Sequence, residues 1–226
     1  MQVTFLGHAC FQVQTSGKTL LFDPFLRANP KARPTDFDTV KPDVIFLSHG
    51  HADHVADAPD LAKKHGCPVV CNYEIANWLS KQGVTNAIGM NLGGTVKFDS
   101  ISAKHVPAAH SSELPDGTYG GNPGGFVVRF PEGSFYYSGD TALIADMKLV
   151  ADLGPFRFAV LCVGDHFTMG YEDAALAAEW LGVKDVLGVH YDTFPPIAIN
   201  HQDAKAAFAK RNIALHLIQP GDGLTF

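Results

Sequence analysis

The segment Val44-Ile45-Phe46-Leu47-Ser48-His49-Gly50-His51-Ala52-Asp53-His54 decides both the fold and the chemistry of this chain. Its first four residues are apolar and predict a buried strand. The seven that follow contain three histidines and one aspartate. Neutral imidazole nitrogens and carboxylate oxygens are natural ligands for zinc and its first-row neighbours. We therefore expect a metal-binding cluster where this strand ends.

The spacing within the cluster divides it into two parts. His49 and His51 are two residues apart, so in extended backbone they project to the same side. Asp53 and His54 follow on a turn and can face a second position. We therefore expect this one short loop to begin two metal sites. A solvated histidine-rich turn is the alternative, which we disfavour because crowded imidazoles and a carboxylate without partners cost desolvation and repulsion.

Length and composition predict an ordinary globular protein. With 226 residues, 46% of them hydrophobic and 18% charged, the chain can bury a substantial core, and we expect a single domain over residues 1–226. The formal net charge is −6 and no run of Lys or Arg occurs, which argues against a nucleic-acid partner. We expect a small-molecule substrate instead, and the sequence leaves a homo-oligomer open.

The N-terminal residues alternate like a strand and lack the basic start and long apolar stretch of a signal peptide. No segment approaches the ~20 apolar residues of a membrane span. We therefore expect a cytoplasmic protein without a membrane partner. The cysteines fit a reducing compartment as buried thiols, because Cys67 and Cys71 lie too far apart along an extended strand to form a disulfide.

Strands and helices alternate along much of the chain, which indicates an α/β architecture of two packed sheets with helices outside. The polar, proline-interrupted residues 26–41 predict a long surface loop that forms part of a substrate wall. Asn200 is a predicted N-cap of the last helix. The expected strands span residues 2–6, 10–14, 19–22, 43–47, 68–71, 94–98, 101–106, 125–130, 134–138, 158–163, 185–189 and 214–218, and the expected helices span 55–65, 73–82, 143–152, 172–181 and 201–211.

Three further candidate ligands, His110, Asp140 and His190, each follow an apolar strand elsewhere in the chain. A sheet scaffold can bring residues at strand ends to one rim, so we expect these side chains near the residue 49–54 cluster. Taken alone, Ser138-Gly139-Asp140-Thr141 also fits an ordinary turn. The other candidate ligands make the metal interpretation the stronger one.

The order of these residues resembles the metallo-β-lactamase superfamily over nearly the whole chain. The resemblance implies a four-layer αββα sandwich, with two mixed β-sheets packed face to face and helices outside, and a metal-dependent hydrolase activity. The motifs most similar to a compact branch of metal-dependent hydrolases, related to the L-ascorbate-6-phosphate lactonase group, are Gly7-His8, His110-Ser111-Ser112, Ser138-Gly139-Asp140-Thr141 and His190-Tyr191-Asp192-Thr193-Phe194-Pro195.

The resemblance also implies two divalent metal ions, each with an open coordination position, as in catalytic sites. Two ions roughly 3.5–4 Å apart can share a hydroxide and stabilise the oxyanion that forms when it attacks. We expect zinc, with manganese, iron or nickel as alternatives. Asp53 is expected to be catalytic as well, by accepting the proton of the water. The implied ligands are His49, His51 and His110 for one ion and Asp53, His54 and His190 for the other, with Asp140 bridging.

Two histidines outside this ligand set are candidates for catalysis. His8, in a tight turn at a strand end, is expected to be a hydrogen-bond donor behind the ligands or a proton shuttle. His166, in the loop after the strand 158–163, is expected to orient substrate or protonate the leaving group. The resembling branch carries Gly-Gly where this chain has Gly164-Asp165. The remaining histidines, His65, His105, His201 and His216, are interpreted as structural or solvated.

The sequence thus favours a hydrolase that attacks a small ester, lactone or phosphodiester, since each develops negative charge on oxygen. β-Lactamase activity is disfavoured because no export signal is visible, and a tRNA-processing nuclease because no basic arm is. The alternative is a non-hydrolytic metal protein on the same fold, such as an iron redox enzyme or a sensor. Metal analysis and an oxygen-reduction assay distinguish these two functions.

Overall fold

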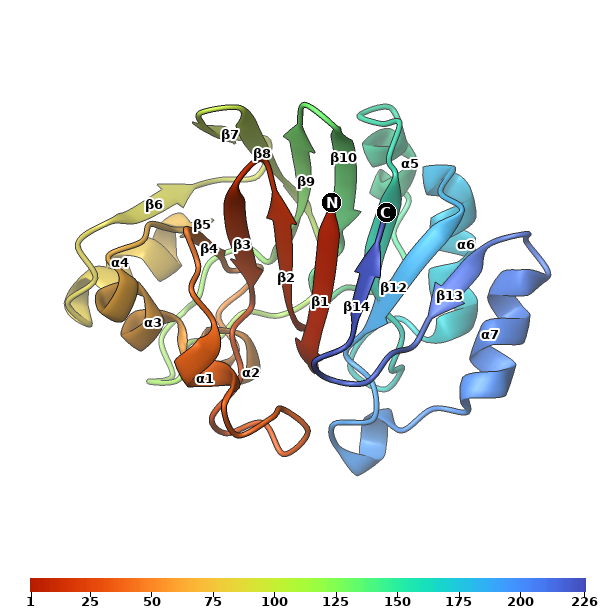
Figure 1. The fold of residues 1–226 in the computed structure, drawn as a ribbon, viewed down its shortest axis with the longest axis horizontal. Helices are drawn as coiled ribbons and strands as arrows, with labels where there is room; N and C mark the ends of the chain where they lie inside the picture. The colour runs from red at the N-terminus through yellow and green to blue at the C-terminus, as the bar shows by residue number, and fades with distance from the viewer.

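Two β-sheets pack face to face between outer layers of helices in the computed structural model, which describes residues 1–226 (Figure 1). This arrangement confirms the predicted αββα sandwich. Sheet A has the strand order β14 (Gly223–Thr225), β1 (Gln2–Gly7), β2 (Cys10–Thr15), β3 (Lys18–Phe22), β4 (Val44–Phe46), β5 (Val69–Asn72) and β6 (Ala87–Met90). Sheet B has the order β13 (Ala214–His216), β12 (Asp185–Val189), β11 (Phe158–Cys162), β10 (Gly133–Tyr137), β9 (Gly124–Phe130), β8 (Ile101–Pro107) and β7 (Thr95–Phe98).

The helices form two layers outside the sheets. Helices α3 and α4 cover sheet A, and α5, α6 and α7 cover sheet B (Figure 1). None of these helices has both the length and the apolar character needed to cross a membrane. The helices are α1 (Asp36–Thr39), α2 (Ala52–Val55), α3 (Ala58–His65), α4 (Tyr73–Lys81), α5 (Asp146–Ala151), α6 (Tyr171–Leu181) and α7 (His201–Ala209), with the 3-10 turn η1 (Pro195–Ile197).

Aromatic side chains fill the space between the two sheets. Phe11, Phe22 and Phe46 come from neighbouring strands of sheet A and stack with ring centroids 4.6 and 4.8 Å apart. Phe126 of sheet B meets Phe46 edge-on at 5.3 Å and so joins the two sheets. All four rings are fully buried, and each such side chain contributes about 1.5–3 kcal/mol to folding.

A second, smaller core lies between sheet A and its helices. Leu21 and Ile45 pack there with Leu61 of α3 and Leu79 of α4. Strand β4 is therefore buried on both faces, and it pairs in parallel with β3 and β5. Burial on both faces explains why residues 44–47 are continuously apolar rather than alternating.

The prediction of one continuous helix over residues 55–65 is wrong, and the difference affects the site. The chain forms two helices there, α2 and α3, and Asp53 and His54 lie on α2 rather than on an open turn. Pro59 accounts for the break, because it lacks an N–H and its ring would clash with the carbonyl of Val55 in a continuous helix. The predicted N-cap of α7 is confirmed, since the Asn200 side chain accepts hydrogen bonds from the backbone N–H groups of residues 202 and 203.

Several short elements were not expected from the sequence. They are the edge strands β6 and β14, the 3-10 turn η1, and helix α1 within the 26–41 loop. Strand β14 pairs with β1 and returns the chain to sheet A, so the closing strand near residue 214 is not the last one. Each of these elements has only three or four residues, too few for a periodic pattern to be recognised.

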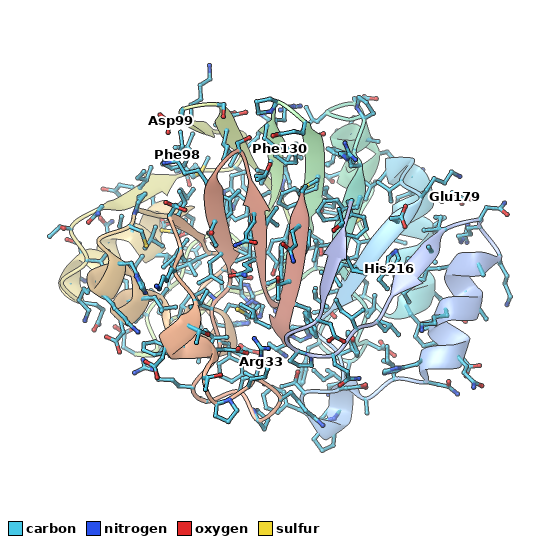
Figure 2. All side chains as sticks on the ribbon, viewed as in Figure 1. Arg33, Phe98, Asp99, Phe130, Glu179 and His216 are labelled. Carbon is cyan, nitrogen blue, oxygen red and sulfur yellow. The ribbon has the colours of Figure 1, made fainter.

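One rim of the sandwich collects the ends of many strands. Strands β1, β3 and β4 run in one direction in sheet A, and β8, β10, β11 and β12 share a direction in sheet B. The two sets end together, because His190 N donates to His8 O at 2.7 Å across the sheets. Arg33 lies at this rim, and Phe98 and Phe130 lie at the opposite one (Figure 2).

Candidate metal centre

All seven predicted metal ligands lie together at this rim. They come from the segments that follow four strands: β4, β8, β10 and β12. The strand-end argument from the sequence therefore placed them correctly. The ligands belong to two sets, the residue 49–54 cluster from sheet A and the three single residues His110, Asp140 and His190 from sheet B.

Asp140 lies at the centre of the cluster. Its Oδ2 atom is 2.9 Å from His190 Nε2, 3.2 Å from His54 Nε2, 3.8 Å from His110 Nε2 and 4.0 Å from His49 Nε2. The preceding residue, Gly139, has φ +60°, and a Cβ there would lie 2.9 Å from the Cβ of Ser48. Glycine thus lets the turn after β10 approach the β4 loop and deliver the carboxylate between the imidazoles.

His49, His51 and His110 form one group of converging donor atoms, all within 4.8 Å of one another. His49 Nε2 lies 3.0 Å from His51 Nδ1. The other ring nitrogens are engaged elsewhere, His49 Nδ1 with Ser48 Oγ at 2.9 Å and His51 Nε2 with Ser111 Oγ at 3.2 Å. These outer contacts fix which nitrogen of each ring faces the centre.

Asp53, His54 and His190 converge in a second group, together with His8. Asp53 Oδ2 lies 3.9 Å from His190 Nε2 and 4.0 Å from His54 Nε2. The Asp53 side chain is 31% exposed, whereas those of His54 and His190 are at most 3% exposed. Asp53 is therefore the candidate ligand of this group that faces solvent.

The residues present fit divalent metal ions. His54 Nε2 and Asp140 Oδ1 are buried without a hydrogen-bond partner, which is costly unless something else satisfies them. Nε2 atoms and carboxylate oxygens that converge from several strands are the donors that zinc and its neighbours accept. Each group also contains at least three donors, enough to hold one ion.

The carboxylates give the centre a negative character that favours a cation. Burial raises the pKa of the Asp140 carboxyl, but His190 and His54 lower that pKa more, and it falls well below its usual range. Burial lowers the pKa of His54, but the three aspartates around it raise that pKa well above its usual value. The surrounding aspartates thus favour a positive charge on the His54 imidazole.

Asp23 is a residue of the candidate site that the sequence interpretation missed. Its Oδ2 accepts hydrogen bonds from Ser48 Oγ at 2.5 Å, His54 Nδ1 at 2.8 Å and Tyr137 OH at 2.6 Å, and its Oδ1 accepts from Ser48 N at 2.8 Å. Although Asp23 also lies near His49 and His54 as a possible ligand group, its oxygens are already used. It orients both imidazoles, and the signal in the sequence was a carboxylate directly after the strand beside β4.

His8 contacts the centre through Asp53. Its Nε2 lies 2.9 Å from Asp53 Oδ2, and its Nδ1 lies 2.9 Å from Thr193 Oγ1. Burial lowers the pKa of His8 to about 4, although the hydrogen bond to Asp53 opposes this. The neutral ring therefore donates Nε2–H to the Asp53 carboxylate and accepts a hydrogen bond from the Thr193 hydroxyl at Nδ1. This arrangement fits the expectation that His8 donates a hydrogen bond to a candidate metal ligand.

His166 is not brought into the centre. It is exposed on the loop after β11, and its ring meets the edge of Phe167 at 4.5 Å. Phe167, which the sequence interpretation did not single out, instead lines the cavity above the ligands. A direct role for His166 in proton transfer stays a prediction.

Three residues that come directly after a strand at this rim have a left-handed backbone conformation, which residues other than glycine rarely adopt. They are His8 at φ 58°, Asp23 at φ 42° and His190 at φ 58°. Such conformations cost on the order of 1–3 kcal/mol each and persist where the surroundings hold them. All three occur directly after a strand, where the turn swings the side chain toward the centre.

The open side of the centre is a cavity of about 310 Å³. Its walls combine exposed faces of the ligands with two aromatic rings and one hydroxyl. The lining residues are His51, Asp53, His110, Ser111, Asp140, Phe167, His190 and Phe194.

The cysteines take no part in the centre. All four are free and buried, and burial raises the pKa of the Cys67 and Cys162 thiols to about 11. They are therefore protonated at neutral pH and pack as small apolar side chains. This confirms the expectation of buried core thiols.

Comparison with known proteins agrees with the site. The sequence family described as "Beta-lactamase superfamily domain" matches residues 18–191. A UPF0173 metal-dependent hydrolase of Methylacidiphilum infernorum is 47% identical over 224 residues, which cover 99% of each chain. A second protein of that description, from Flavobacterium johnsoniae, is 42% identical over 224 residues with the same coverage.

A solved structure gives the same result in three dimensions. Igni18, described as a novel metallo hydrolase from the hyperthermophilic archaeon Ignicoccus hospitalis, is 30% identical and superimposes with a TM-score of 0.90. The match covers 100% of this chain and 97% of that one. The chain therefore belongs to the β-lactamase superfamily, in the UPF0173 family of metal-dependent hydrolases.

Proposed function

We propose that this protein hydrolyses a small ester, lactone or phosphodiester with a dinuclear metal centre, zinc being the first expectation and manganese, iron or nickel the alternatives. The observation that carries the proposal is the position of Asp140 Oδ2, within 4.0 Å of the Nε2 atoms of four histidines that belong to both ligand groups. An oxygen so placed suits a ligand shared between two ions. Two separate groups of possible ligands, each with at least three donor atoms, support the proposal of two ions.

The division of ligands follows the two groups of donors. His49, His51 and His110 would hold one ion, and Asp53, His54 and His190 would hold the other. Asp140, whose Oδ2 lies near histidines of both groups, would contribute to both sites. When bound, two divalent ions provide an activated water as nucleophile and stabilise the negative oxygen of the transition state. Asp23 and Ser48 keep His49 and His54 oriented with Nε2 toward the centre.

The chain's own residues handle the proton. Asp53 has a carboxylate open to the cavity, so we assign it as the acceptor of the proton that the attacking water loses. Burial raises the pKa of Asp53, but His54 and His8 lower that pKa more, so the carboxylate is ionised. His8 holds Asp53 in place through Nε2–H, and Thr193 holds His8.

We further propose that residues 1–226 act as one domain in the cytoplasm on a small-molecule substrate. The cavity of about 310 Å³ over the candidate ligands supports a small substrate. The net charge of −6 is unfavourable for a nucleic-acid partner.

The proposal is tested by metal analysis and a hydrolysis screen on the same preparations. Protein purified without chelators and loaded in turn with zinc, manganese, iron or nickel is assayed against esters, lactones and phosphodiesters. We expect about two ions per chain and hydrolysis of at least one substrate class. A metal content near zero, or bound iron that reduces oxygen without any hydrolysis, contradicts the proposal.

A further inference from the structure

The walls of the cavity carry no cationic side chain. Apart from the metal ligands, they consist of two aromatic rings, Phe167 and Phe194, and the hydroxyl of Ser111. A substrate group that lies beyond the metal ions thus meets rings and one weak polar contact. A phosphate or carboxylate there would lose its hydration without gaining an ion pair.

Phe167 occupies an unusual position for a phenylalanine. It is 54% exposed, and it lies next to Asp165 and His166, which have φ 59° and 55°. Two successive left-handed residues other than glycine are unfavourable, so the surrounding contacts must hold the loop in this shape.

The loop that carries Phe167 is fixed to the metal centre. Met169 N donates to Thr141 O at 2.8 Å, directly beside Asp140, and Gly164 and Gly170 form a bridge that closes the loop. The edge of the Phe167 ring rests against the His166 imidazole. An exposed ring on a loop tied in this way is positioned at the mouth of the cavity rather than free in solvent.

Phe194 provides the second aromatic surface. It lies four residues after His190 in the loop that follows β12, is partly buried, and meets the ring of His8 edge-on at 5.6 Å. Because β11 and β12 are adjacent and parallel, their following loops lie beside each other. Both loops therefore place a phenylalanine on the wall of one cavity.

We infer that the substrate carries an uncharged apolar or aromatic group beside its scissile bond, bound between Phe167 and Phe194, and no second anionic group. This inference rests on the proposed hydrolytic function and narrows it. The cavity of about 310 Å³ lies at the lower end of the roughly 300–1,000 Å³ typical of small-molecule sites, so the group is small. Lactones and esters with a remote phosphate are thereby disfavoured.

The test uses hydroxamates, which bind metal ions through two oxygens and report on the cavity wall without any hydrolysis. Acetohydroxamate, benzohydroxamate and succinomonohydroxamate are titrated by calorimetry into the metal-loaded protein. We expect benzohydroxamate to bind about tenfold more tightly than acetohydroxamate, and the carboxylate-bearing compound to bind no more tightly than acetohydroxamate. Phe167→Ala should remove most of the tenfold advantage with metal content unchanged, and Phe167→Leu should retain part of it.

Tyr73→Ala is the matched control, since Tyr73 is an aromatic residue of similar exposure, 57%, outside the cavity; its affinities should equal those of the unmodified protein. The inference is overturned if the carboxylate compound binds most tightly, if Phe167→Ala keeps the full preference for benzohydroxamate, or if no hydroxamate binds. Failure of the proposed function is distinct, because it appears as absent hydrolysis of neutral esters and lactones by protein that shows the expected binding order.

Discussion

His54, at the rim of the sandwich, and His105, inside sheet B, are both fully buried. His54 has Asp23, Asp53 and Asp140 around it, and its pKa is raised despite burial. His105 stacks on Phe126 at 5.1 Å, neither of its ring nitrogens has a partner, and burial lowers its pKa to about 4. A buried imidazole thus becomes a candidate ligand only where other donors converge on it.

The largest effect that tests this contrast is expected for Asp140→Ala. The substitution removes the oxygen on which four imidazoles converge, so bound metal should fall and hydrolysis should drop by about 10²–10³-fold or more. Metal analysis and initial rates measure the two effects. Asp185→Asn is the control, since Asp185 also pairs with a histidine, His216, at 2.8 Å but lies at the start of β12, away from the centre. Equal losses in both variants contradict the role of Asp140.

Asp23→Asn should weaken metal binding about 10–100-fold, the usual effect of losing a group that orients a metal-binding histidine. The amide can no longer accept all the hydrogen bonds that Ser48, His54 and Tyr137 donate. Competition with a chelator of known affinity gives the dissociation constants. Tyr137→Phe, which removes only one of these donors, should have a smaller effect, and unchanged affinity in Asp23→Asn would refute the assignment.

His105→Leu should make the protein less sensitive to acid. In the native state the His105 imidazole stays neutral down to a pKa of about 4, whereas in the unfolded chain it binds a proton below its ordinary value of 6.5. The unfolded state therefore binds more protons between these values, and the free energy of unfolding falls as pH falls through this window. At pH 5 this fall in the free energy of unfolding should be about 2 kcal/mol smaller in His105→Leu. The difference corresponds to a factor of about 30 in the unfolding equilibrium constant.

Denaturant unfolding of the two proteins at pH 5 and pH 8 measures this difference directly. Any effect of the metal ligands appears in both proteins and cancels in the comparison. If the unmodified protein and His105→Leu lose the same free energy of unfolding between pH 8 and pH 5, His105 is not the acid-sensitive group.

The smallest effect is expected for His8→Ala. Asp53 remains a ligand but loses the hydrogen bond that holds it, so turnover should fall about tenfold while most of the metal is retained. Metal content and turnover number are measured on the same sample. Loss of metal in proportion to activity would instead make His8 a ligand, as its place among the donors of Asp53, His54 and His190 permits.

Much of the fold and of the ligand set followed from the sequence alone. Apolar strands that end in histidine or aspartate are local patterns, and a sheet scaffold can bring such ends to one rim. His49, His110, Asp140 and His190 were therefore recognisable in the sequence as candidate ligands, and the resemblance to the metallo-β-lactamase superfamily implied how they divide between two ions. The buried β4 run was recognisable for the same reason, because a strand covered on both faces must be apolar throughout.

The tertiary structure decided the contacts between residues far apart in the chain. Asp23 meets Tyr137, 114 positions later, and His8 meets Thr193, 185 positions later. The paths of the loops determine these long-range contacts, and they include left-handed turns at His8 and His190. No local sequence pattern encodes such contacts. For the same reason Phe167 lines the cavity while its neighbour His166 does not, because the path of a turn decides which of two adjacent side chains reaches the site.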